Sequence, residues 1–373
     1  YKMKPKFKET IPYFFLNKEI QIGEEEGLAG IIPDPTGSIS FLINKLDGQR
    51  NIPNIVQEVQ KEFPDISSNE IIEAIKVLGN EGYLEDNSIV PELNDYTLER
   101  YKANINYFSL FTKFGEDKYK IQEKILETPI ALLGVGGLGT QVLYHLAALG
   151  FHNIKALDFD NIELSNFNRQ LLYSESDIGN SKVEMAKKRI SQFNPNVDLQ
   201  IINKKIESPQ DVIEHIEGTE LVICVADKPT LHIANWVNEG VVKCNLPMVY
   251  GGVLNTRGRF FSMIPSKTGC VQCHINYARQ LNDKQDEQLE AMNNMEFTRN
   301  NAAISPNVAI VAGTIVNEAL KILTQIAQPI SLGKVMEVDF LTLETNTVSS
   351  WEKMLDCPLC GQVVKSEVKL KVK

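Results

Sequence analysis

Charged side chains suited to phosphate chemistry follow two apolar stretches of this sequence. Asp158 and Asp160 come directly after the first stretch, with Arg169 and Lys182 further along, and Asp227 comes after the second. Carboxylates can bind a ribose or Mg²⁺, and an arginine and a lysine can neutralise charge on phosphate oxygens where water is scarce. Together these residue types are what transfer chemistry at the α-phosphate of ATP requires.

A glycine-rich turn precedes these side chains. The apolar run 130–133 ends in Gly134-Val135-Gly136-Gly137-Leu138-Gly139. Such a strand-to-helix turn lets the backbone approach a phosphate, and the N-terminus of the helix offers unpaired N–H groups to an anion. A tight turn without a ligand is the alternative for an isolated glycine pattern. Because Asp158 stands at the distance where nucleotide-binding folds place a ribose-binding acid, we expect a nucleotide site.

Strand-like and helical patterns alternate around these residues. Strands are expected at 130–133, 154–158, 199–203 and 221–224, with helices between them at 137–149, 181–193 and 209–216. This alternation predicts an α/β fold with a mainly parallel sheet that helices cover on both faces. The charged side chains lie just beyond the strand ends or on the following helix, at the sheet edge where such folds bind ligands.

The pattern changes after residue 224. We expect a helix at 230–242, strands at 248–250 and 258–263, an apolar helix at 306–325 and further strands in the tail. The region 281–301 is polar and acidic. This composition indicates a mobile crossover loop or lid, or an ordinary surface loop.

Four of the six cysteines form two Cys-x-x-Cys pairs, Cys270 with Cys273 and Cys357 with Cys360. In a chain whose N-terminus lacks the pattern of a secretion signal, two such pairs predict a tetrahedral thiolate zinc site rather than disulfides. Four thiolates leave no open position on the metal, so the expected role of the zinc is structural. A redox-active Cys-x-x-Cys pair is the alternative.

Residues 1–90 have a different pattern, with strand-like pieces at 13–16 and 29–32. Helical patterns follow at 38–46, 55–63 and 69–78. This order resembles the winged-helix domain with which modification enzymes hold the leader of a ribosomally made precursor peptide. The resemblance implies that a short peptide pairs with an exposed sheet edge. A dimerisation or structural appendage is the alternative. Residues 91–128 are expected to form a linker and helical lead-in.

The overall charge limits the classes of partner. A formal net charge of −10 argues against sequence-independent binding of nucleic acid or anionic membranes. No segment approaches the roughly 20 apolar residues of a membrane span. We therefore expect no nucleic-acid partner, no membrane and, by default, a cytoplasmic location.

As an ordered set, the motifs resemble the ubiquitin-activating-type (E1-like) adenylation family, and its bacterial ThiF/MoeB branch in particular. The set spans about residues 100–361 and comprises the glycine turn, Asp158 with Asp160, 165–170, 179–182, Asp227 and the four paired cysteines. The resemblance implies a Rossmann-like E1 fold over 129–373, with zinc knuckles and a crossover loop. It also implies adenylation of a carboxylate with ATP and Mg²⁺ by a homodimer.

The same resemblance implies roles for single residues. Asp158 would bind the ribose and Asp227 the Mg²⁺, and Arg169, Lys182 and Asp227 would be catalytic. The phosphate turn would be lined by Gly134, Gly136, Gly137 and Gly139, and the phosphates would be contacted by Asn166, Arg169 and Lys182.

Two departures from the family pattern stand out. Members usually carry Arg-Tyr-x-Arg before the glycine turn, with the second arginine reaching the partner subunit's ATP site, whereas this chain has Arg100-Tyr101-Lys102-Ala103. The second departure is the lack of an obvious thioester cysteine, because Cys224 and Cys244 lie in apolar sequence and are expected to be inert.

A peptide-holding domain joined to an E1-like fold resembles the enzymes that modify precursor peptides of the microcin C and pantocin types. We therefore expect adenylation of a carboxylate on such a peptide. One alternative is a ThiF/MoeB-type adenylyltransferase that acts on the Gly-Gly tail of a sulfur-carrier protein, although that function leaves residues 1–90 unexplained. The other is an inactive scaffold that delivers a peptide, for which Asp158, Arg169, Lys182 and Asp227 would be unnecessary.

Overall fold

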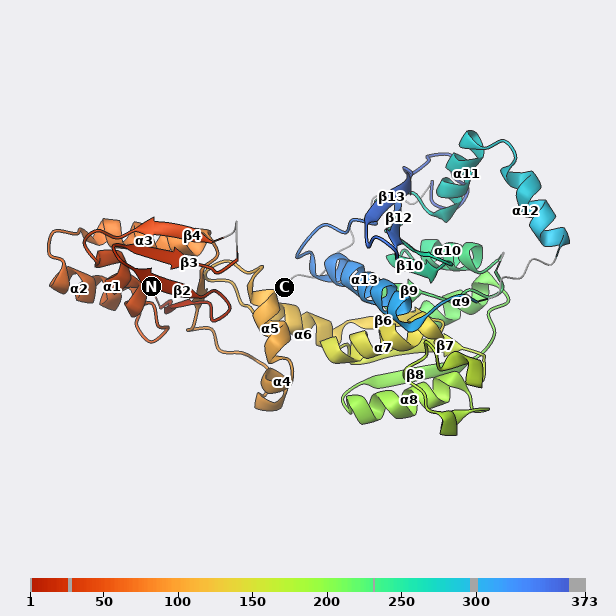
Figure 1. The fold of residues 1–373 in the computed structure, drawn as a ribbon, viewed down its shortest axis with the longest axis horizontal. Coiled ribbons are helices and arrows are strands. Elements are labelled where there is room, and N and C mark those ends of the chain that lie inside the picture. The colour runs from red at the N-terminus through yellow and green to blue at the C-terminus, as the bar shows by residue number, and fades with distance from the viewer. Residues whose placement is uncertain (1, 26–28, 231, 296–300, 362–373) are drawn as a thin grey trace. The chain divides into compact units, whose positions relative to one another are not determined.

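The computed structural model describes residues 2–25, 29–230, 232–295 and 301–361, and the chain divides into two compact units, Tyr1–Lys124 and Ile125–Lys373 (Figure 1). Each unit buries a hydrophobic cluster of its own.

The first unit contains two small antiparallel sheets and a group of helices. Strand β1 (Pro5–Phe7) pairs with β5 (Leu84–Asp86), and a separate sheet has the order β2 (Tyr13–Leu16), β3 (Glu19–Ile22) and β4 (Gly30–Pro33). The helices are α1 (Ser38–Lys45), α2 (Ile52–Glu62), α3 (Ser68–Asn80), α4 (Asp95–Arg100) and α5 (Lys102–Ser109). Helix α6 (Lys120–Glu127) contains the boundary between the units, after Lys124.

Local capping fixes where two of these helices begin. The Asn51 side chain accepts a hydrogen bond from the backbone N–H of Asn54 and begins α2, with Pro53 in its first turn. Ser67 and Glu70 form a reciprocal capping box at the start of α3. The apolar faces of α1–α3 then pack with Ile20 and Ile22 of β3 in one core.

The second unit is organised on an eight-stranded sheet in the order β13-β12-β11-β10-β9-β6-β7-β8. Its five strands from β10 to β8 are parallel, and the other three continue the sheet in antiparallel fashion. The strands are β6 (Pro129–Leu133), β7 (Asn153–Asp158), β8 (Asp198–Asn203), β9 (Leu221–Cys224), β10 (Met248–Val253), β11 (Arg257–Met263), β12 (Lys334–Asp339) and β13 (Thr345–Ser350).

Helices cover both faces of this sheet. On one face α9 (Pro209–Ile216) packs against α10 (Ile233–Lys243), and their apolar side chains join Met248 of β10 in a buried cluster. A Cβ at Gly251, three residues further along the same strand, would project from the opposite face and meet Ile315 of α13 (Ser305–Thr324). That helix packs against α7 (Gly137–Leu149). The remaining helices are α8 (Lys182–Phe193), α11 (Val271–Leu281), α12 (Gln285–Asn294) and the short 3₁₀ turns η1 (Leu164–Asn166) and η2 (Glu175–Asp177).

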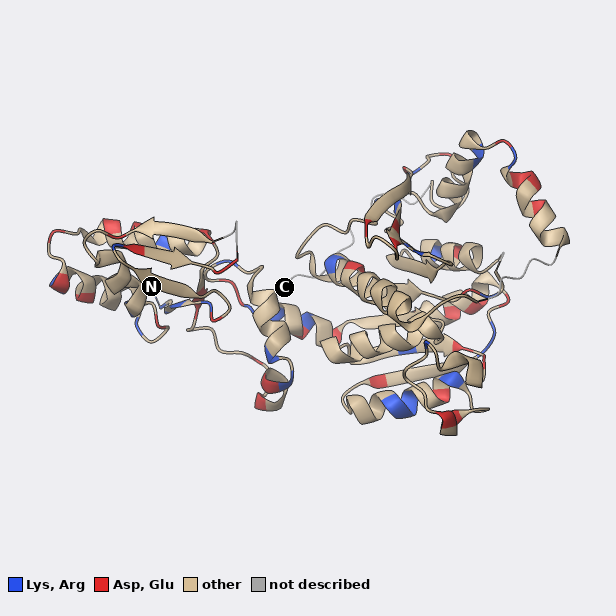
Figure 2. Ribbon diagram, in the orientation of Figure 1, with Lys and Arg blue, Asp and Glu red and all other residues tan. Residues whose placement is uncertain are grey.

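The expected α/β fold with a mainly parallel sheet is confirmed, but the expectation for 281–301 is wrong in part. Residues 285–294 form helix α12, whereas 296–300 lie outside the described residues. The sequence of α12 is rich in Glu, Gln, Ala, Met and Leu, which favour helices, and its acidic residues include two in the first turn (Figure 2). Because α12 buries none of its residues, it has no apolar stripe that sequence periodicity could detect.

Other differences concern short elements. The sequence patterns missed β1, β3, α4 and α11. The expected helical lead-in consists of α5 and α6, with turns around Gly115 between them. Helix α13 is long and apolar enough by length and composition to cross a membrane, which corrects the expectation that no segment approaches that length. It packs against α7 and the sheet in the second unit, and this burial accounts for its apolar character.

Candidate functional site

A cavity of about 520 Å³ opens at the carboxyl ends of β6, β7, β9 and β10. The sheet reverses its winding between β6 and β9, because the chain moves from β6 outward to β8 and then returns to β9 on the other side of β6. Open α/β sheets bind ligands at this switch point. The lining includes most of the residues expected at a nucleotide site: Gly134, Gly136, Gly137, Asp158, Asn166, Arg169, Lys182 and Asp227.

The glycine turn connects β6 tightly to α7. Gly134 has φ +96°, and a Cβ there would lie 2.9 Å from the backbone nitrogen of Ala226 beyond β9. At Gly139, which does not line the cavity, a Cβ would collide with the carbonyl of Gly134. Gly134 is therefore required by its backbone conformation and Gly139 by the close approach of the helix to the turn.

Backbone hydrogen bonds hold the Asp158 carboxylate beside the glycine turn. Its Oδ2 accepts from the N–H of Val135 at 2.7 Å, and its Oδ1 accepts from the N–H of Asp160 at 2.8 Å. Both oxygens are thus oriented by the main chain. A carboxylate fixed at the end of the second strand is in position to accept hydrogen bonds from ribose hydroxyl groups.

Two lysines approach one carboxylate in the cavity. Lys182 Nζ lies 3.0 Å from Asp160 Oδ2, and Lys228 Nζ lies 3.9 Å from the same oxygen. The Lys182 side chain is buried, whereas that of Lys228 is 61% exposed. The Tyr173 hydroxyl lies 3.0 Å from the carbonyl of Val135 and 3.1 Å from that of Lys182, so it connects the glycine turn to the start of α8.

Arg169 and Asn166 belong to the turn that includes η1. The Asn166 Oδ1 accepts from the N–H of Glu163 at 3.0 Å, so this side chain helps to form the turn itself. Arg169 Nη1 donates to the Ser165 carbonyl at 3.0 Å and to Asn168 Oδ1 at 2.7 Å. These contacts leave the guanidinium without a carboxylate partner among the described residues, and therefore available to an anion in the cavity.

Asp227 follows β9 and is exposed in the cavity. Its carboxylate has no hydrogen bond or ion pair within the part of the chain that the structure describes. Just before it, Cys224 is fully buried, and burial raises the pKa of its thiol to about 12. Burial also raises the pKa of Cys244. Both cysteines are therefore poor nucleophiles at neutral pH, in agreement with the expectation that they are inert.

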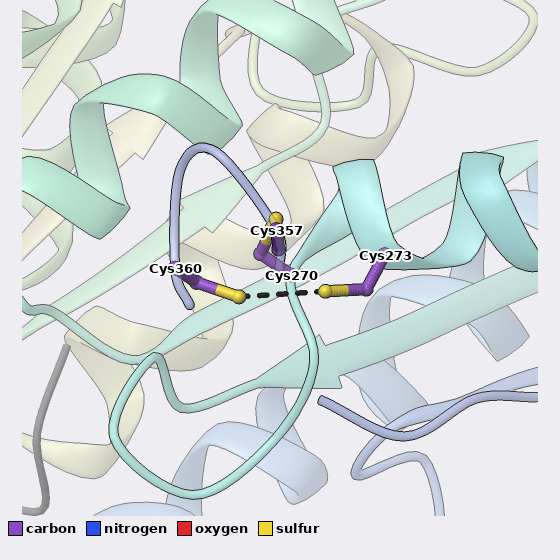
Figure 3. Close-up of side chains that lie close together, drawn as sticks. All are labelled: Cys270, Cys273, Cys357 and Cys360. Atoms are coloured by element: carbon purple, nitrogen blue, oxygen red, sulfur yellow. Dashed lines mark hydrogen bonds between the residues drawn. The ribbon is translucent and has the colours of Figure 1, made fainter. Parts of the chain in front are cut away.

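The four paired cysteines come together, as the sequence predicts (Figure 3). Their sulfur atoms all lie within 4.8 Å of one another, with 3.7 Å between Cys270 and Cys357 and 3.4 Å between Cys273 and Cys360. A tetrahedral zinc site with Zn–S bonds of about 2.3 Å needs S–S separations of about 3.8 Å. All four residues are buried, so the donor set and its spacing fit a metal of the zinc type.

Aromatic packing and backbone contacts surround this cysteine cluster. Trp351 Nε1 donates to the Gly269 carbonyl at 3.1 Å, and the Trp351 ring lies 4.4 Å from the ring of His274. The N–H of Met354 donates to Cys273 Sγ at 3.4 Å. Hydrogen bonds from the thiols of Cys273 and Cys360 lower the pKa of Cys270, which favours the thiolate form that binds metal.

The cavity also contains residues that the motifs did not indicate. They come from the end of β10 and from the segment before α13, and comprise 250–255 and 301–303. Asn168 Nδ2 donates to the Ala303 carbonyl at 2.9 Å and so connects this segment to the η1 turn. The glycine pair 251–252 after an apolar stretch was a usable signal for β10, whereas the contact to Ala303 depends on tertiary structure alone.

The first unit presents an apolar sheet edge. Strand β2 is at one edge of its sheet, and Phe14, Phe15 and Leu16 are 44%, 45% and 48% exposed. Strand β4, at the other edge, ends in Pro33, which has no N–H to donate.

The motif Arg100-Tyr101 lies where α4 ends and α5 begins. Tyr101 is buried there, and Arg100 donates to the Tyr96 hydroxyl at 3.2 Å.

Comparisons of sequence relate the greater part of the chain to known proteins. The model of the ThiF family matches residues 101–359. Molybdopterin-synthase adenylyltransferase of Salmonella typhimurium is 25% identical over 273 residues, which are 73% of this chain and 99% of that protein. Sulfur carrier protein ThiS adenylyltransferase of Bacillus subtilis is 29% identical over 245 residues, 64% of this chain and 67% of that protein.

Comparisons of structure extend further along the chain. A crystal structure of E. coli MccB has a TM-score of 0.78 at 21% identity and covers 96% of this chain and 97% of that one. The structure of PaaA has a TM-score of 0.72 at 22% identity and covers 93% of this chain and 100% of that one. Other MccB structures contain ATP, or N-formylated MccA bound to what is described as a microcin C7 biosynthetic enzyme. At this level of identity the likeness shows the fold.

Proposed function

The chain belongs to the ThiF family of E1-like adenylyltransferases, and we propose that it adenylates a carboxylate of a ribosomally made precursor peptide during maturation of a microcin C- or pantocin-like antibiotic. The observation that carries this proposal is the first unit. The match to the Salmonella relative uses 73% of this chain and nearly the whole of that protein, so part of this chain has no counterpart there. The match to MccB uses 96% of this chain. A substrate-holding role gives the additional part of the chain a function.

In the proposed reaction a peptide carboxylate oxygen attacks the α-phosphorus of ATP. The bond between that phosphorus and the bridging oxygen breaks, and pyrophosphate leaves with the electron pair, so the peptide becomes an acyl-adenylate. Asp158 binds the ribose, the glycine turn admits the phosphates, and Arg169 and Lys182 neutralise the charge that develops on them.

Asp227 is the residue we propose for binding Mg²⁺. Its exposed carboxylate has no competing partner among the described residues, and a hard oxygen donor at the rim of a phosphate site suits this ion. Magnesium supplies charge neutralisation on the phosphate oxygens. For the cysteine cluster we propose zinc in a structural role, since its four buried sulfur donors leave no open position.

The edge strand β2 is the surface we propose for the peptide. An extended segment can pair with the free backbone groups of an edge strand, and Phe14, Phe15 and Leu16 would contact its alternate side chains. Phe14 pairs in register with Gln21, away from the core residue Ile20, so Phe14→Asp changes the edge with little effect on the core. We expect this variant to weaken peptide binding about tenfold or more while leaving ATP binding unchanged.

A matched control is Val77→Asp, which places the same charge on an exposed apolar position of α3 in the same unit. Peptide binding is measured by fluorescence anisotropy with a labelled peptide encoded by a short neighbouring open reading frame. Equal loss of affinity in both variants would assign the effect to the unit as a whole. Full affinity in Phe14→Asp would contradict the placement of the peptide on β2.

The function itself is tested by incubating the protein with that peptide, ATP and Mg²⁺. Mass spectrometry and a pyrophosphate assay are read together. An adenylyl group on the peptide, or a loss of water, accompanied by pyrophosphate, supports the proposal and distinguishes a nucleotide-bearing product from a cyclised one. Failure to release pyrophosphate with the peptide would count against it.

A second candidate function is activation of a sulfur-carrier protein. It is favoured by the sequence relatives, which are adenylyltransferases for molybdopterin synthase and for ThiS. Pyrophosphate release with a carrier protein ending in Gly-Gly, but not with the peptide, would support this candidate. We also propose a homodimer, on the basis of the family resemblance, and sedimentation velocity of the full chain measures its mass.

A further inference from the structure

Helix α10 contributes a buried amide to the surroundings of the cysteine cluster. Asn238 lies in the middle of this helix and is 1% exposed. Its Oδ1 accepts a hydrogen bond from the backbone N–H of Val271 at 2.9 Å. Val271 is the first residue of α11, and Cys270, at the N-cap position before it, makes no capping hydrogen bond with its own side chain. Asn238 therefore supplies from another helix the cap that α11 lacks.

The same amide lies next to a metal ligand in the chain. Val271, its hydrogen-bond partner, directly follows Cys270, so Asn238 holds the backbone one residue from a sulfur donor of the cluster. A backbone N–H can only donate, so the contact with Val271 requires the carbonyl oxygen of the amide and fixes which way the amide is turned.

We propose that Asn238 is a positioning residue of the four-cysteine metal site, which holds Cys270 and the first turn of α11 in the geometry that binds zinc. Cys270 and Cys273 are the N-cap residue and a first-turn residue of α11, so the start of this helix determines where both sulfur atoms point. A cap at Val271 fixes that start. The fixed backbone in turn sets the direction in which the Cys270 and Cys273 side chains leave the helix.

Asn238 comes from a helix that contains none of the four cysteines. The other contacts to the cluster come from segments adjacent to the cysteines, such as the N–H of Met354 on Cys273. Asn238 instead belongs to α10, the helix that follows the segment with Asp227. In this proposal, the Asn238 side chain connects α10 to the metal site, in addition to the two Cys-x-x-Cys segments. The inference concerns the metal site and does not depend on which carboxylate the enzyme activates.

The test compares three variants of the full chain loaded with zinc. Asn238→Asp keeps an oxygen for Val271 but adds a buried negative charge beside the residue that follows Cys270. Asn238→Ser is a milder change that retains a small hydrogen-bonding group. The control Asn276→Asp alters an asparagine of α11 whose side-chain contact is with Gln272 rather than with a cysteine.

Zinc loss to a coloured chelator is followed in time, and Co²⁺ is substituted to record the thiolate-to-metal charge-transfer band. For Asn238→Asp we expect zinc loss at least about tenfold faster and a shifted cobalt band, with Asn238→Ser intermediate and Asn276→Asp unchanged. If Asn238→Asp fails to fold, the comparison of Asn238→Ser with the control decides. Wild-type rates and spectra in the folded Asn238 variants would overturn the proposal, as would wild-type protein that binds neither zinc nor cobalt.

Discussion

The cavity and the cysteine cluster belong to the same unit but differ in the exposure of their polar groups and in the partners that these groups have. In the cavity, Asp227 is exposed and unpaired among the described residues, and Lys228 only approaches a carboxylate. In the cluster, all four sulfur donors are buried within 4.8 Å of one another, and the N–H of Met354 donates to one of them. A site that binds and releases a substrate keeps charges available, whereas a site that retains a metal satisfies them permanently.

Replacing a cavity carboxylate should separate activity from stability most strongly. We expect Asp227→Ala to reduce pyrophosphate release by about 10³-fold, because the charge proposed to bind Mg²⁺ is lost. Its melting temperature should remain that of the wild type, since the carboxylate is exposed. The control Asp198→Ala removes an exposed carboxylate at the start of β8. This position lies where the parallel strands begin, away from the cavity at their carboxyl ends, so activity should stay intact. Turnover close to wild type in Asp227→Ala would exclude it from the metal site.

Replacing a cysteine of the cluster should have the reverse effect. Cys360→Ser is expected to cost on the order of 3 kcal/mol of the free energy of unfolding, because a buried metal ligand is lost. The KM for ATP should change little in the protein that remains folded. Calorimetry and zinc content provide the measurements, with Cys244→Ser, outside the cluster, as the control. A variant as stable as the wild type would show that the cluster does not support the fold.

A buried histidine next to β6 makes the stability of this unit depend on pH. His215 Nε2 is 3.3 Å from the Leu132 carbonyl of β6, and burial lowers the pKa of this histidine to about 4. The unfolded chain binds a proton near pH 6.5, so stability is lost as pH falls from about 6.5 towards 4. From pH 6.5 to 5 the loss should be about 1.6 kcal/mol.

Urea unfolding of wild type and His215→Gln over this pH range measures that loss. The difference between the two proteins isolates His215 from groups that titrate in both, such as the cluster thiolates. We expect a flatter pH dependence in the variant. Parallel curves would mean that His215 is protonated at the same pH in the folded and the unfolded chain.

The smallest expected effect concerns the second lysine of the cavity. Lys228 is largely exposed, so water screens its charge, and Lys228→Ala should raise the KM for ATP by only about threefold to tenfold. Pyrophosphate exchange at varied ATP concentration measures this change. Lys188→Ala, an exposed lysine of α8 outside the cavity lining, is the matched control. An equal effect in both variants would remove Lys228 from the site.

The sequence indicated the parts of the molecule that local patterns specify. The strands and helices from 130 to 224 follow from apolar runs and glycines, and the meeting of Asp158, Lys182 and Asp227 follows from the rule that parallel strands end at one edge. The four cysteines were found together because their spacing is characteristic of metal sites.

The remaining features depend on contacts between distant segments. Asn238 looks like any polar residue of a helix until its position beside Val271 is known. The Tyr173 hydroxyl, between the carbonyls of Val135 and Lys182, has no sequence signal either. Helix α12 was missed for the opposite reason, since it buries nothing and so carries no periodic apolar face.

The packing of Trp351 gives the metal site an optical signal of its own. The chain has two tryptophans, Trp236 on α10 and Trp351 against His274 beside the cluster, and Trp351 is buried. Trp236 stacks on His232 at the start of α10. Both indoles pack in the buried cluster that contains the four cysteines, and neither lines the cavity. Intrinsic fluorescence should change in intensity and wavelength when metal leaves, and should stay nearly constant when nucleotide binds.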